Sequence, residues 1–369
     1  MPLKALPQRQ SLVAQTVAFL DAQIAAGEWR DWLPSERSLC ELLQVSRNTL
    51  RAALAQMKAE GRIEPLHGAG NRITAKRAPA ARTASTDVAL LTPLPLERLR
   101  PLQSLWIDDM RALLSERGVR LRVFHGQHYY AANPGPALQK LTARNPHGCW
   151  IPMLANEAMQ RWFARNQVPC VVAGSTYPGL DLPHRDLDHR AMCRHAAGVL
   201  LGAGHRRLVM LAQRSRRAGD LAGEAGFVEG VKASRHEGAE AMVVYHEDSV
   251  ASVAQALRRI LKLQPAPTAL FVVHPHYYLA VASRLAQAGV RVPEQIALIA
   301  RDDDPSLEFL VPVPARYRVN PHTLAKALLR PVLEVLDGGA VSQRASLIMP
   351  EFVRGESVGS ARAEGTGEG

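Results

Sequence analysis

The sequence predicts an α/β protein in which a small N-terminal part, made of helices and one β-hairpin, precedes two lobes built on parallel sheets. Two capped helical patterns and a Gly-rich turn follow one another within residues 33–74. Short apolar runs then alternate with helical patterns between residues 88 and 300, which is typical of parallel sheets covered by helices on both faces. A length of 369 residues suits two or three such domains.

The first helix of the N-terminal part is predicted to follow the sequence Leu-Pro-Ser-Glu-Arg at residues 33–37. Its proline stops any preceding helix, and the hydroxyl of Ser35 can accept a hydrogen bond from the first turn as an N-cap. Because Leu39, Leu42 and Leu43 recur at helical spacing, we expect all three to lie on one face.

The second helix is predicted to begin at Ser46 and to end at Gly61, a residue suited to the left-handed backbone that follows many helices. Its buried face repeats apolar residues three and four positions apart, namely Leu50, Ala53, Leu54 and Met57. Its opposite face carries polar and cationic side chains, namely Arg47, Asn48, Arg51 and Lys58. Such a helix can reach base edges while its positive dipole end faces phosphate.

Residues 62–66 and 71–74 are predicted to pair across a tight turn at residues 67–70, forming a wing behind the two helices. For the helices alone, a charged helical hairpin with a solvated face is the alternative interpretation. The order of two capped helices, a basic face and a Gly-tipped hairpin favours a winged helix-turn-helix that inserts into a DNA groove.

Residues 10–75 resemble the winged helix-turn-helix domain of GntR-family transcription regulators. The resemblance rests on residues 33–37, on the pattern Val-Ser-Arg-x-Thr-x-Arg at 45–51, on Glu-Gly-Arg-Ile at 60–63 and on His-Gly at 67–68. It implies DNA contacts for Arg37, Arg47 and Arg51, major-groove positions for Ser46, Asn48 and Thr49, and wing-tip positions for His67 and Gly68. Residues 29–32 depart from the family pattern, and we expect their two Trp side chains to pack within the protein.

Charge supports a polyanionic partner for the N-terminal part. The chain has 45 Lys and Arg against 34 Asp and Glu, a formal net charge of +11. Residues 1–82 contain 12 basic and 7 acidic residues, so the basic excess per residue is higher there than in the remainder. We expect salt-dependent binding to a double-stranded DNA operator.

Several classes of protein are excluded by what the sequence lacks. It has no run of 18 apolar residues and no apolar signal region, which predicts no membrane span and a cytoplasmic location. The four cysteines are scattered without a CxxC pair, so neither zinc nor a disulfide framework is expected. A metal site at His274 and His276 is disfavoured by the intervening proline and the lack of a clear third ligand. No catalytic motif is present, so we expect neither an enzyme nor a cofactor.

The larger part contains a series of candidate strands and helices. Strands are predicted at 88–91, 120–124, 149–153, 170–173, 207–211, 242–245, 269–273 and 296–300. Helices are predicted at 102–117, 189–202, 250–263 and 278–288. Because ligands bind at the carboxyl ends of parallel strands, we expect a ligand cleft between two lobes.

Residues 86–358 resemble the effector-binding domain of LacI-family repressors, which is itself similar to periplasmic sugar-binding proteins. The resemblance rests on four segments: 188–208, Gly-Phe at 226–227, 267–303, and a closing strand within 349–357. It implies a two-lobed, periplasmic-binding-protein-like sensor with parallel sheets, binding of a small-molecule effector, and a homodimer.

Departures from the LacI-family pattern fall where the ligand would be held. Gly223 stands in place of an Arg that clamps sugar hydroxyls, and His274-Pro275 stands in place of an Asn-Asp pair. Residues 315–317 read Ala-Arg-Tyr instead of Leu-Thr-Thr, and only Asp302 remains of the usual polar set. These changes disfavour a plain hexose or pentose as the effector.

Six residues are therefore the candidates for effector binding: Asp302, His274, His276, Tyr277, Arg301 and Arg316. A cationic and aromatic lining of this kind favours a phosphorylated, acidic or aromatic ligand. The alternative is that these are solvated loop side chains around a cleft that binds little.

The domain boundaries predicted from these patterns are a DNA-binding domain at 1–75, a linker at 76–86, an effector domain at 87–355 and a disordered tail at 356–369. The function predicted is a transcription regulator, by default a repressor, whose operator affinity responds to a metabolite. A two-fold dimer implies an inverted-repeat operator. The alternative is a DNA-binding regulator whose degenerate sensor serves only for dimerisation.

Overall fold

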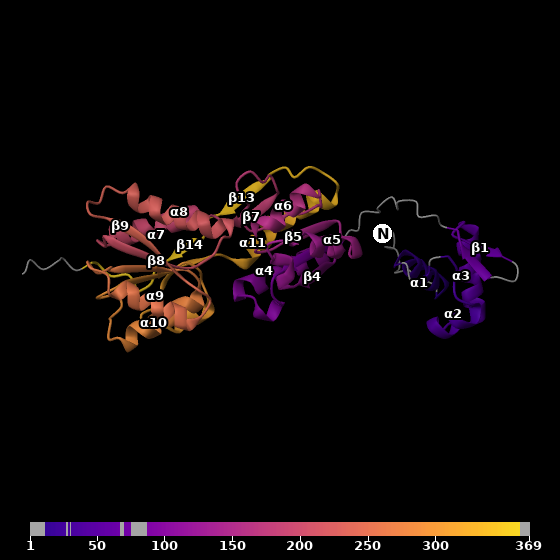
Figure 1. Cartoon of the computed structure of the whole chain (residues 1–369), viewed down its shortest axis with the longest axis horizontal. Helices are drawn as coiled ribbons and strands as arrows, with labels where there is room; N and C mark the ends of the chain where they lie inside the picture. Colours follow the sequence, from indigo (N-terminus) through magenta and orange to yellow (C-terminus); the bar gives the residue numbers. More distant parts are fainter. Residues whose placement is uncertain (1–11, 27–28, 30, 67–69, 75–86, 362–369) are drawn as a thin grey trace, which may run out of the picture. The chain divides into compact units, whose positions relative to one another are not determined.

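The protein, seen here as a computed structural model, is described at residues 12–26, 29, 31–66, 70–74 and 87–361. The chain divides into two compact units, 1–83 and 84–369, and each is described by itself (Figure 1). The predicted linker at 76–86 and the predicted wing-tip residues His67 and Gly68 lie outside the described residues.

The first unit has the predicted winged helix-turn-helix architecture. Its elements are α1 Leu12–Ala26, α2 Glu36–Leu43, α3 Arg47–Ala59, β1 Ile63–Leu66 and β2 Gly70–Ile73. The two strands pair antiparallel, and a core built around Leu20, Leu39 and Leu50 holds the three helices together. The caps are also confirmed: the hydroxyls of Ser35 and Ser46 accept hydrogen bonds from the amides of Ser38 and Thr49, both at 3.1 Å.

Gly61 ends α3 as predicted, with φ at 68°. Its amide donates to the carbonyl of Lys58 and the next amide, of Arg62, donates to that of Met57, both at 2.9 Å. The face that carries the three leucines of α2 is only partly buried, because the side chain of Leu42 is 61% exposed. Leu43, one turn after Leu39, is half-buried against the core, whereas Leu42 lies on the outer flank of α2.

The second unit consists of two lobes, and the chain crosses between them more than once. The strands of the first lobe are β3 Val88–Thr92, β4 Leu121–His125, β5 Cys149–Pro152, β6 Val172–Ala173, β7 His184–Leu187 and β13 Ala345–Ile348. They form two parallel sheets, in the orders β4-β3-β5 and β13-β7-β6. Isolated β-bridges between the β5 region and the β6 region connect the two sheets. The helices of this lobe are η1 Leu96–Arg98, α4 Pro101–Ser115, η2 Gln127–Tyr130, α5 Gly135–Arg144, α6 Glu157–Arg165 and α11 Pro321–Leu336.

The second lobe is built on a six-stranded sheet in the order β14-β12-β11-β10-β8-β9, parallel except for β14. Its strands are β8 Arg207–Gln213, β9 Glu240–His246, β10 Ala269–Val272, β11 Ala297–Ala300, β12 Ala315–Arg318 and β14 Glu351–Val353. Its helices are α7 His189–Gly202, α8 Ala218–Lys232, α9 Val250–Leu261, α10 Pro275–Gln287 and η3 Pro305–Phe309. The predicted α/β class with parallel sheets is therefore confirmed.

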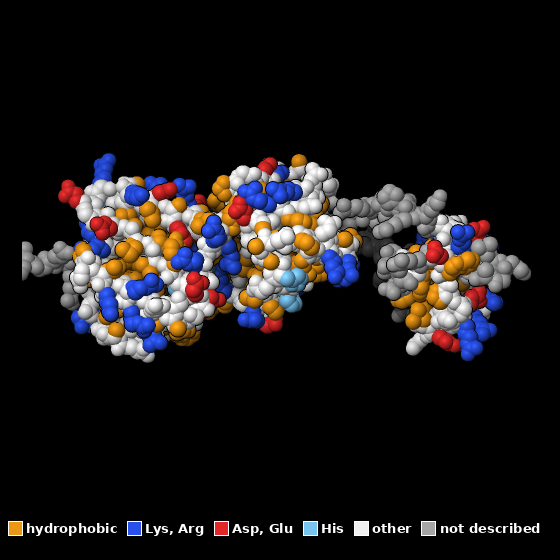
Figure 2. All heavy atoms as spheres, viewed as in Figure 1, with side chains coloured by type: hydrophobic (Ala, Val, Ile, Leu, Met, Phe, Trp, Pro, Cys, Tyr) orange, Lys and Arg blue, Asp and Glu red, His pale blue; other side chains and the backbone are white. Residues whose placement is uncertain are grey.

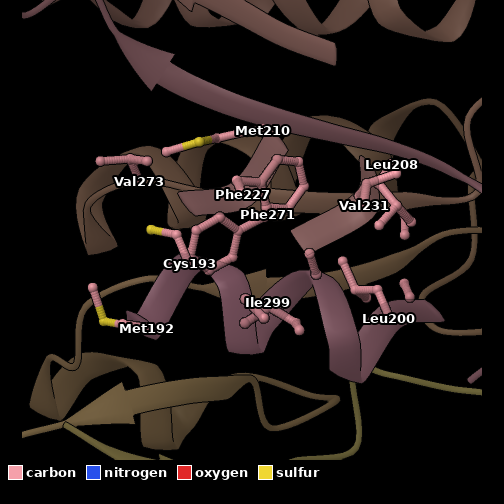
Figure 3. Close-up of a cluster of buried hydrophobic side chains, with 14 of the residues drawn as sticks. Met192, Cys193, Leu200, Leu208, Met210, Phe227, Val231, Phe271, Val273 and Ile299 are labelled. Atoms are coloured by element: carbon pink, nitrogen blue, oxygen red, sulfur yellow. The ribbon is translucent and has the colours of Figure 1, made fainter. Parts of the chain in front are cut away.

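Helices cover both faces of the sheet in the second lobe, so each face has its own core. On one face α7 and α8 pack around Phe227 and Phe271, whose rings stack at 5.6 Å (Figure 3). On the other face α9 and α10 bury Leu257, Tyr278 and Val281 against the same strands. Burial on both faces explains why these strands appear in the sequence as unbroken apolar runs.

The predicted strands are all present, with ends shifted by one or two residues, but three strands were missed: β7, β12 and β13. The predicted disordered tail begins too early, since residues 356–361 pack against the second lobe. Ser357 is buried and its hydroxyl donates to the carbonyl of Leu298 at 2.6 Å, while the amide of Ala361 donates to Ala203 at 2.8 Å. No described helix is long and apolar enough to cross a membrane.

Candidate functional sites: the α3 surface and the interlobe cavity

The first candidate site is the N-terminal turn of α3. Ser46, Arg47, Asn48 and Arg51 are exposed there, and Thr49 is half-buried with its hydroxyl 2.9 Å from that of Ser46. The cap fixes the start of the helix, so these side chains leave the protein from one rigid turn. Positions predicted to face the major groove therefore share one accessible surface.

Ion pairs on this surface are weak enough to be replaced by DNA. The guanidinium of Arg37 lies 3.1 Å from Glu41 and that of Arg51 lies 3.1 Å from Glu36, and all four side chains are at least 40% exposed. Exposed pairs of this kind contribute little to stability. Among the described residues, Arg47 has no hydrogen bond or ion pair from its side chain, so its donors are available to a partner.

The second candidate site is a cavity of about 130 Å³ between the two lobes of the second unit. The first lobe contributes an apolar wall that includes Leu102, Trp106 and Leu328. The second lobe contributes ionisable side chains that follow the carboxyl ends of its strands, namely Arg217, Asp220, His274, Arg301 and Asp302. Figure 2 shows Lys and Arg side chains along the line where the lobes meet.

Arg100, from the first lobe, reaches across this cavity. Its Nη1 lies 2.7 Å from Oδ2 of Asp302 and 2.8 Å from Nδ1 of His274. The Nδ1 of His274 is itself 2.9 Å from the same carboxylate oxygen of Asp302. A buried carboxylate of the second lobe is thus bound by a cation of the first, and the contact ties the lobes together.

Arg301 holds the same carboxylate from within the second lobe. This side chain is 2% exposed and donates to Asp302 from Nε at 3.1 Å and to Asp220 from Nη1 at 2.8 Å. Burial alone would raise the pKa of Asp302, but Arg301, His274 and Arg100 together hold it well below its usual value. Asp302 is therefore ionised at neutral pH.

Burial and the neighbouring Arg100 lower the pKa of His274 to about 3, despite its hydrogen bond to Asp302. The imidazole is therefore neutral at physiological pH. Its Nδ1 then carries a proton and donates to the carboxylate of Asp302.

The predicted effector residues do not all line the cavity. Asp302, His274 and Arg301 do, whereas His276, Tyr277 and Arg316 do not. The hydroxyl of Tyr277 donates to Asp248 at 2.6 Å, and the exposed ring of His276 lies 3.9 Å from that of Tyr277. Arg316 is buried beside Asp303 and Glu308, with N–O distances of 2.6 and 2.8 Å.

Other residues of the cavity were missed in the sequence. They include Arg100, Arg185, Asp186, His189, Arg217 and Asp220. Arg217 and Asp220 follow the carboxyl end of β8, so the rule that ligands bind at strand ends could have found them. Arg100 carries no comparable signal, because it meets Asp302 from the other lobe.

The packing of two helices explains why position 223 is Gly and not the Arg of the family pattern. It is buried where α8 crosses α7, and a Cβ there would lie 3.0 Å from Sγ of Cys193. Nearby, a Cβ at Gly226 would lie 2.1 Å from the carbonyl oxygen of Arg190. The close approach of the two helices thus explains the absence of a large side chain at position 223.

No group of three or more His, Cys, Asp or Glu side chains within the described ranges is placed to hold a metal ion. The rings of His274 and His276 stack at 5.8 Å. The Nδ1 of His274 faces Asp302, as described above.

Two parts of the chain match known families. Residues 12–73 match the bacterial regulatory proteins of the gntR family, and residues 197–358 match the periplasmic binding protein-like domain.

Curated relatives are transcription regulators. The HTH-type transcriptional regulator GntR of Pseudomonas aeruginosa is 25% identical over 72% of this chain and 78% of its own length. The arabinose metabolism transcriptional repressor of Halalkalibacterium halodurans is 24% identical over 73% and 74%. The alignment with the HTH-type transcriptional regulator CelR of Thermobifida fusca, 29% identical, covers 39% of this chain and 43% of that protein.

Solved structures share the fold. The complex of the transcriptional regulator CelR with cellobiose has a TM-score of 0.65 at 19% identity, covering 95% of this chain and 100% of the other. A LacI family transcriptional regulator from Bifidobacterium animalis subsp. lactis has a TM-score of 0.65 at 19% identity, covering 76% and 100%. At these identities the likeness shows the fold alone.

The fold, the α3 surface and these matches define the chain as a DNA-binding transcription regulator. It joins an N-terminal helix-turn-helix domain that matches the gntR family to a periplasmic binding protein-like domain that shares its fold with LacI family regulators. The gntR family and the curated relatives are transcription regulators, which agrees with the prediction that this chain is not an enzyme.

Proposed function

We propose that the protein is a repressor that binds an operator as a homodimer, and that a small molecule in the interlobe cavity changes its operator affinity. The observation that carries the proposal is the salt bridge between Arg100 and Asp302, which joins the lobes across the cavity. A ligand that enters between the lobes must compete with or rearrange this contact. Ligand binding and lobe position are therefore coupled through the same side chains.

The α3 surface supports the DNA part of the proposal. Arg47, Asn48 and Arg51 lie on one exposed turn whose dipole end favours phosphate. A two-fold homodimer would present two such turns to half-sites about one helical turn apart, so the operator is an inverted repeat. Because the partner is DNA, this function places the protein in the cytoplasm.

The effector part follows from linkage. A ligand can shift operator affinity only if it binds the DNA-competent and incompetent forms of the dimer with different affinities. The two forms that we propose are one with the bridge from Arg100 to Asp302 in place, as in the structure, and one in which the ligand has displaced it. The names of two relatives, an arabinose metabolism repressor and a regulator complexed with cellobiose, support a ligand derived from carbohydrate.

One observation favours the alternative of a sensor that serves only for dimerisation. The carboxylate of Asp302 already accepts hydrogen bonds from Arg100, Arg301 and His274, and the cavity is smaller than the ~300–1,000 Å³ of typical ligand pockets. In that case no small molecule would change the affinity for DNA.

The test uses the full-length protein. Duplexes bound from a random pool are sequenced, and sedimentation gives the mass of the complex. We expect an inverted repeat occupied by a dimer. Fluorescence anisotropy with the selected operator then measures affinity in the presence of sugars, sugar acids and sugar phosphates, and at least one compound is expected to change it about fivefold or more.

Selected sites without two-fold symmetry would contradict the dimer. Operator affinity that no compound in the panel changes, together with an unchanged melting temperature, would establish the dimerisation-only alternative. A reporter gene behind the operator separates repression from activation, since a repressor lowers its expression.

A further inference from the structure

We propose that the effector carries an anionic group, a carboxylate or a phosphate, which Arg217 and the unused donors of Arg100 bind inside the interlobe cavity. This inference rests on the proposed function, because it assumes that the cavity takes a small-molecule effector. It goes further by naming the chemistry of the group that is recognised and the residues that recognise it.

The carboxylates in the cavity already accept hydrogen bonds from the protein. Asp302 accepts from three side chains, as described above. Asp220 accepts from Arg301 at 2.8 Å, and Asp186 accepts from the hydroxyl of Ser175 at 2.6 Å and from its neighbouring amide at 2.8 Å. The hydroxyl donors of a neutral sugar would find few free carboxylate oxygens among these three.

The donors, in contrast, are in excess. Among the described residues, the guanidinium of Arg217 has no hydrogen bond or ion pair, although it is half-buried and lines the cavity. Arg100 donates from Nη1 to Asp302, while its Nε and Nη2 have no partner in the described part of the chain. Because these donors are charged and in part shielded from water, they favour an anionic acceptor.

The formal charges agree with the excess of donors. Four guanidinium groups line the cavity, those of Arg100, Arg185, Arg217 and Arg301, against the carboxylates of Asp186, Asp220 and Asp302. Arg185 is buried and donates only to backbone carbonyls, including that of Gln343 at 2.8 Å, so it offsets none of the carboxylates by direct contact. With His274 neutral, the lining has a positive excess that an anion would balance.

The N-terminal ends of three helices add to the positive electrostatic potential of the cavity. Arg100, Arg217 and His274 are the N-cap residues of α4, α8 and α10, three helices of at least 13 residues whose positive ends meet at the cavity. By contrast, side chains of Ser, Asn or Asp cap α2, α3, α6, α7, α9 and α11. A cation at a helix N-terminus is unfavourable for the protein alone, and a bound anion removes that cost.

The rest of the ligand would lie against the opposite wall. Leu102, Trp106 and Leu328 present apolar surface there. An anionic group attached to a compact sugar or aliphatic body matches both walls. We expect the lobes to separate as such a ligand enters, which would weaken the bridge from Arg100 to Asp302.

The test is a calorimetric titration of the full-length protein with matched ligands at one ionic strength. D-glucose is compared with D-gluconate and D-glucose 6-phosphate, and D-galactose with D-galacturonate and D-galactose 6-phosphate. We expect at least one acid or phosphate ester to bind about tenfold more tightly than its neutral parent. Whether the acid or the ester binds distinguishes a carboxylate from a phosphate.

Arg217→Gln is the decisive variant, and Arg216→Gln is its matched control, because Arg216 is exposed and does not line the cavity. We expect Arg217→Gln to weaken binding of the anionic ligand about tenfold or more and Arg216→Gln to leave it unchanged. Since the side chain of Arg217 has no partner among the described residues, the variant should fold, and its melting curve checks this.

Two results would overturn the inference while leaving the proposed function standing. One is a neutral sugar that binds as tightly as its anionic derivatives and changes operator affinity. The other is an anionic ligand whose binding Arg217→Gln does not weaken. If no compound of either kind binds, the inference and the effector part of the proposed function both fail, whereas operator binding is unaffected.

Discussion

The two candidate sites of this regulator hold their charged groups in opposite ways. On the α3 surface, Arg47 and Arg51 are exposed and at most loosely paired. In the interlobe cavity, Arg301 and Asp302 are buried and bound to each other and to further charged groups. The first arrangement leaves donors ready for a large polyanion, and the second makes each charge depend on its neighbours.

This difference indicates at which site a substitution that affects function also affects stability. Removing an exposed cation from the α3 surface takes away a DNA contact and little else. Removing a buried cation from the cavity leaves carboxylates without compensation, which is costly even when no ligand is involved. Substitutions at the two sites should therefore separate affinity from stability.

The largest effect is expected for Arg301→Ala. It leaves Asp220 and Asp302 buried without their shared cation, and loss of one partner of a buried pair costs about 3–5 kcal/mol. Urea denaturation followed by circular dichroism measures the free energy of unfolding. Arg258→Ala, an exposed change on α9, is the control and should have little effect. A loss for Arg301→Ala no larger than the control would show that the cavity network contributes nothing to stability.

The double variant Arg47→Ala with Arg51→Ala tests the opposite case. We expect operator affinity at physiological salt to fall by about a hundredfold or more, because two cations that bind phosphate or bases are removed. The melting curve should stay that of the unchanged protein, since both side chains are exposed. Unchanged affinity would show that α3 does not enter the groove. The slope of affinity against salt, compared with that of the unchanged protein, shows how many phosphates the two side chains neutralise.

A third prediction concerns pH and the buried imidazole of His274. Its pKa is about 3 in the folded protein and close to 6.5 in the unfolded chain, so below pH 6.5 the unfolded chain takes up a proton that the folded protein does not. Stability from this group is present above pH 6.5 and is lost as pH falls, by about 2 kcal/mol at pH 5. Asp302, Arg100 and Arg301 face the ring and stay charged over this range.

The variant His274→Asn removes this dependence, and Asn tolerates the positive φ of 74° at this position better than most residues. Unfolding free energies between pH 7 and pH 5 should therefore fall less steeply for the variant than for the unchanged protein. His236→Asn, at an exposed histidine, is the control and should follow the unchanged curve. Parallel curves for His274→Asn would show that the ring titrates normally in the fold.

Sequence reasoning succeeded in the first unit because the signals there are local. Ser35, Ser46 and Gly61 mark helix ends through their own hydrogen bonds and backbone angles, and each was predicted from its neighbours alone. In the second unit the apolar strands were found for the same reason. The strand β7 was missed because polar residues occupy positions where an apolar pattern was expected. The guanidinium of Arg185 donates hydrogen bonds to backbone carbonyls, and Asp186 lines the cavity.

The cavity itself could be predicted only in part. Asp302, His274 and Arg301 come directly after predicted strands, so the carboxyl-end rule found them. Arg100 lies 202 positions before Asp302 and becomes its partner only through the meeting of two lobes. Arg316 was proposed from its place in the family pattern at 315–317, but it lies within β12, where Asp303 and Glu308 bind it, and no pattern in the sequence reveals such pairing.

The smallest effect is expected for Glu41→Gln, which breaks the exposed pair with Arg37. The melting temperature should shift by less than about 4 °C, because surface substitutions rarely change stability much. Operator affinity should be kept or rise slightly at low salt, since a carboxylate that repels phosphate is removed and Arg37 becomes free. A clear loss of affinity would mean that Glu41 orients Arg37 for contact with DNA, and the α3 surface would then depend on paired charges much as the cavity does.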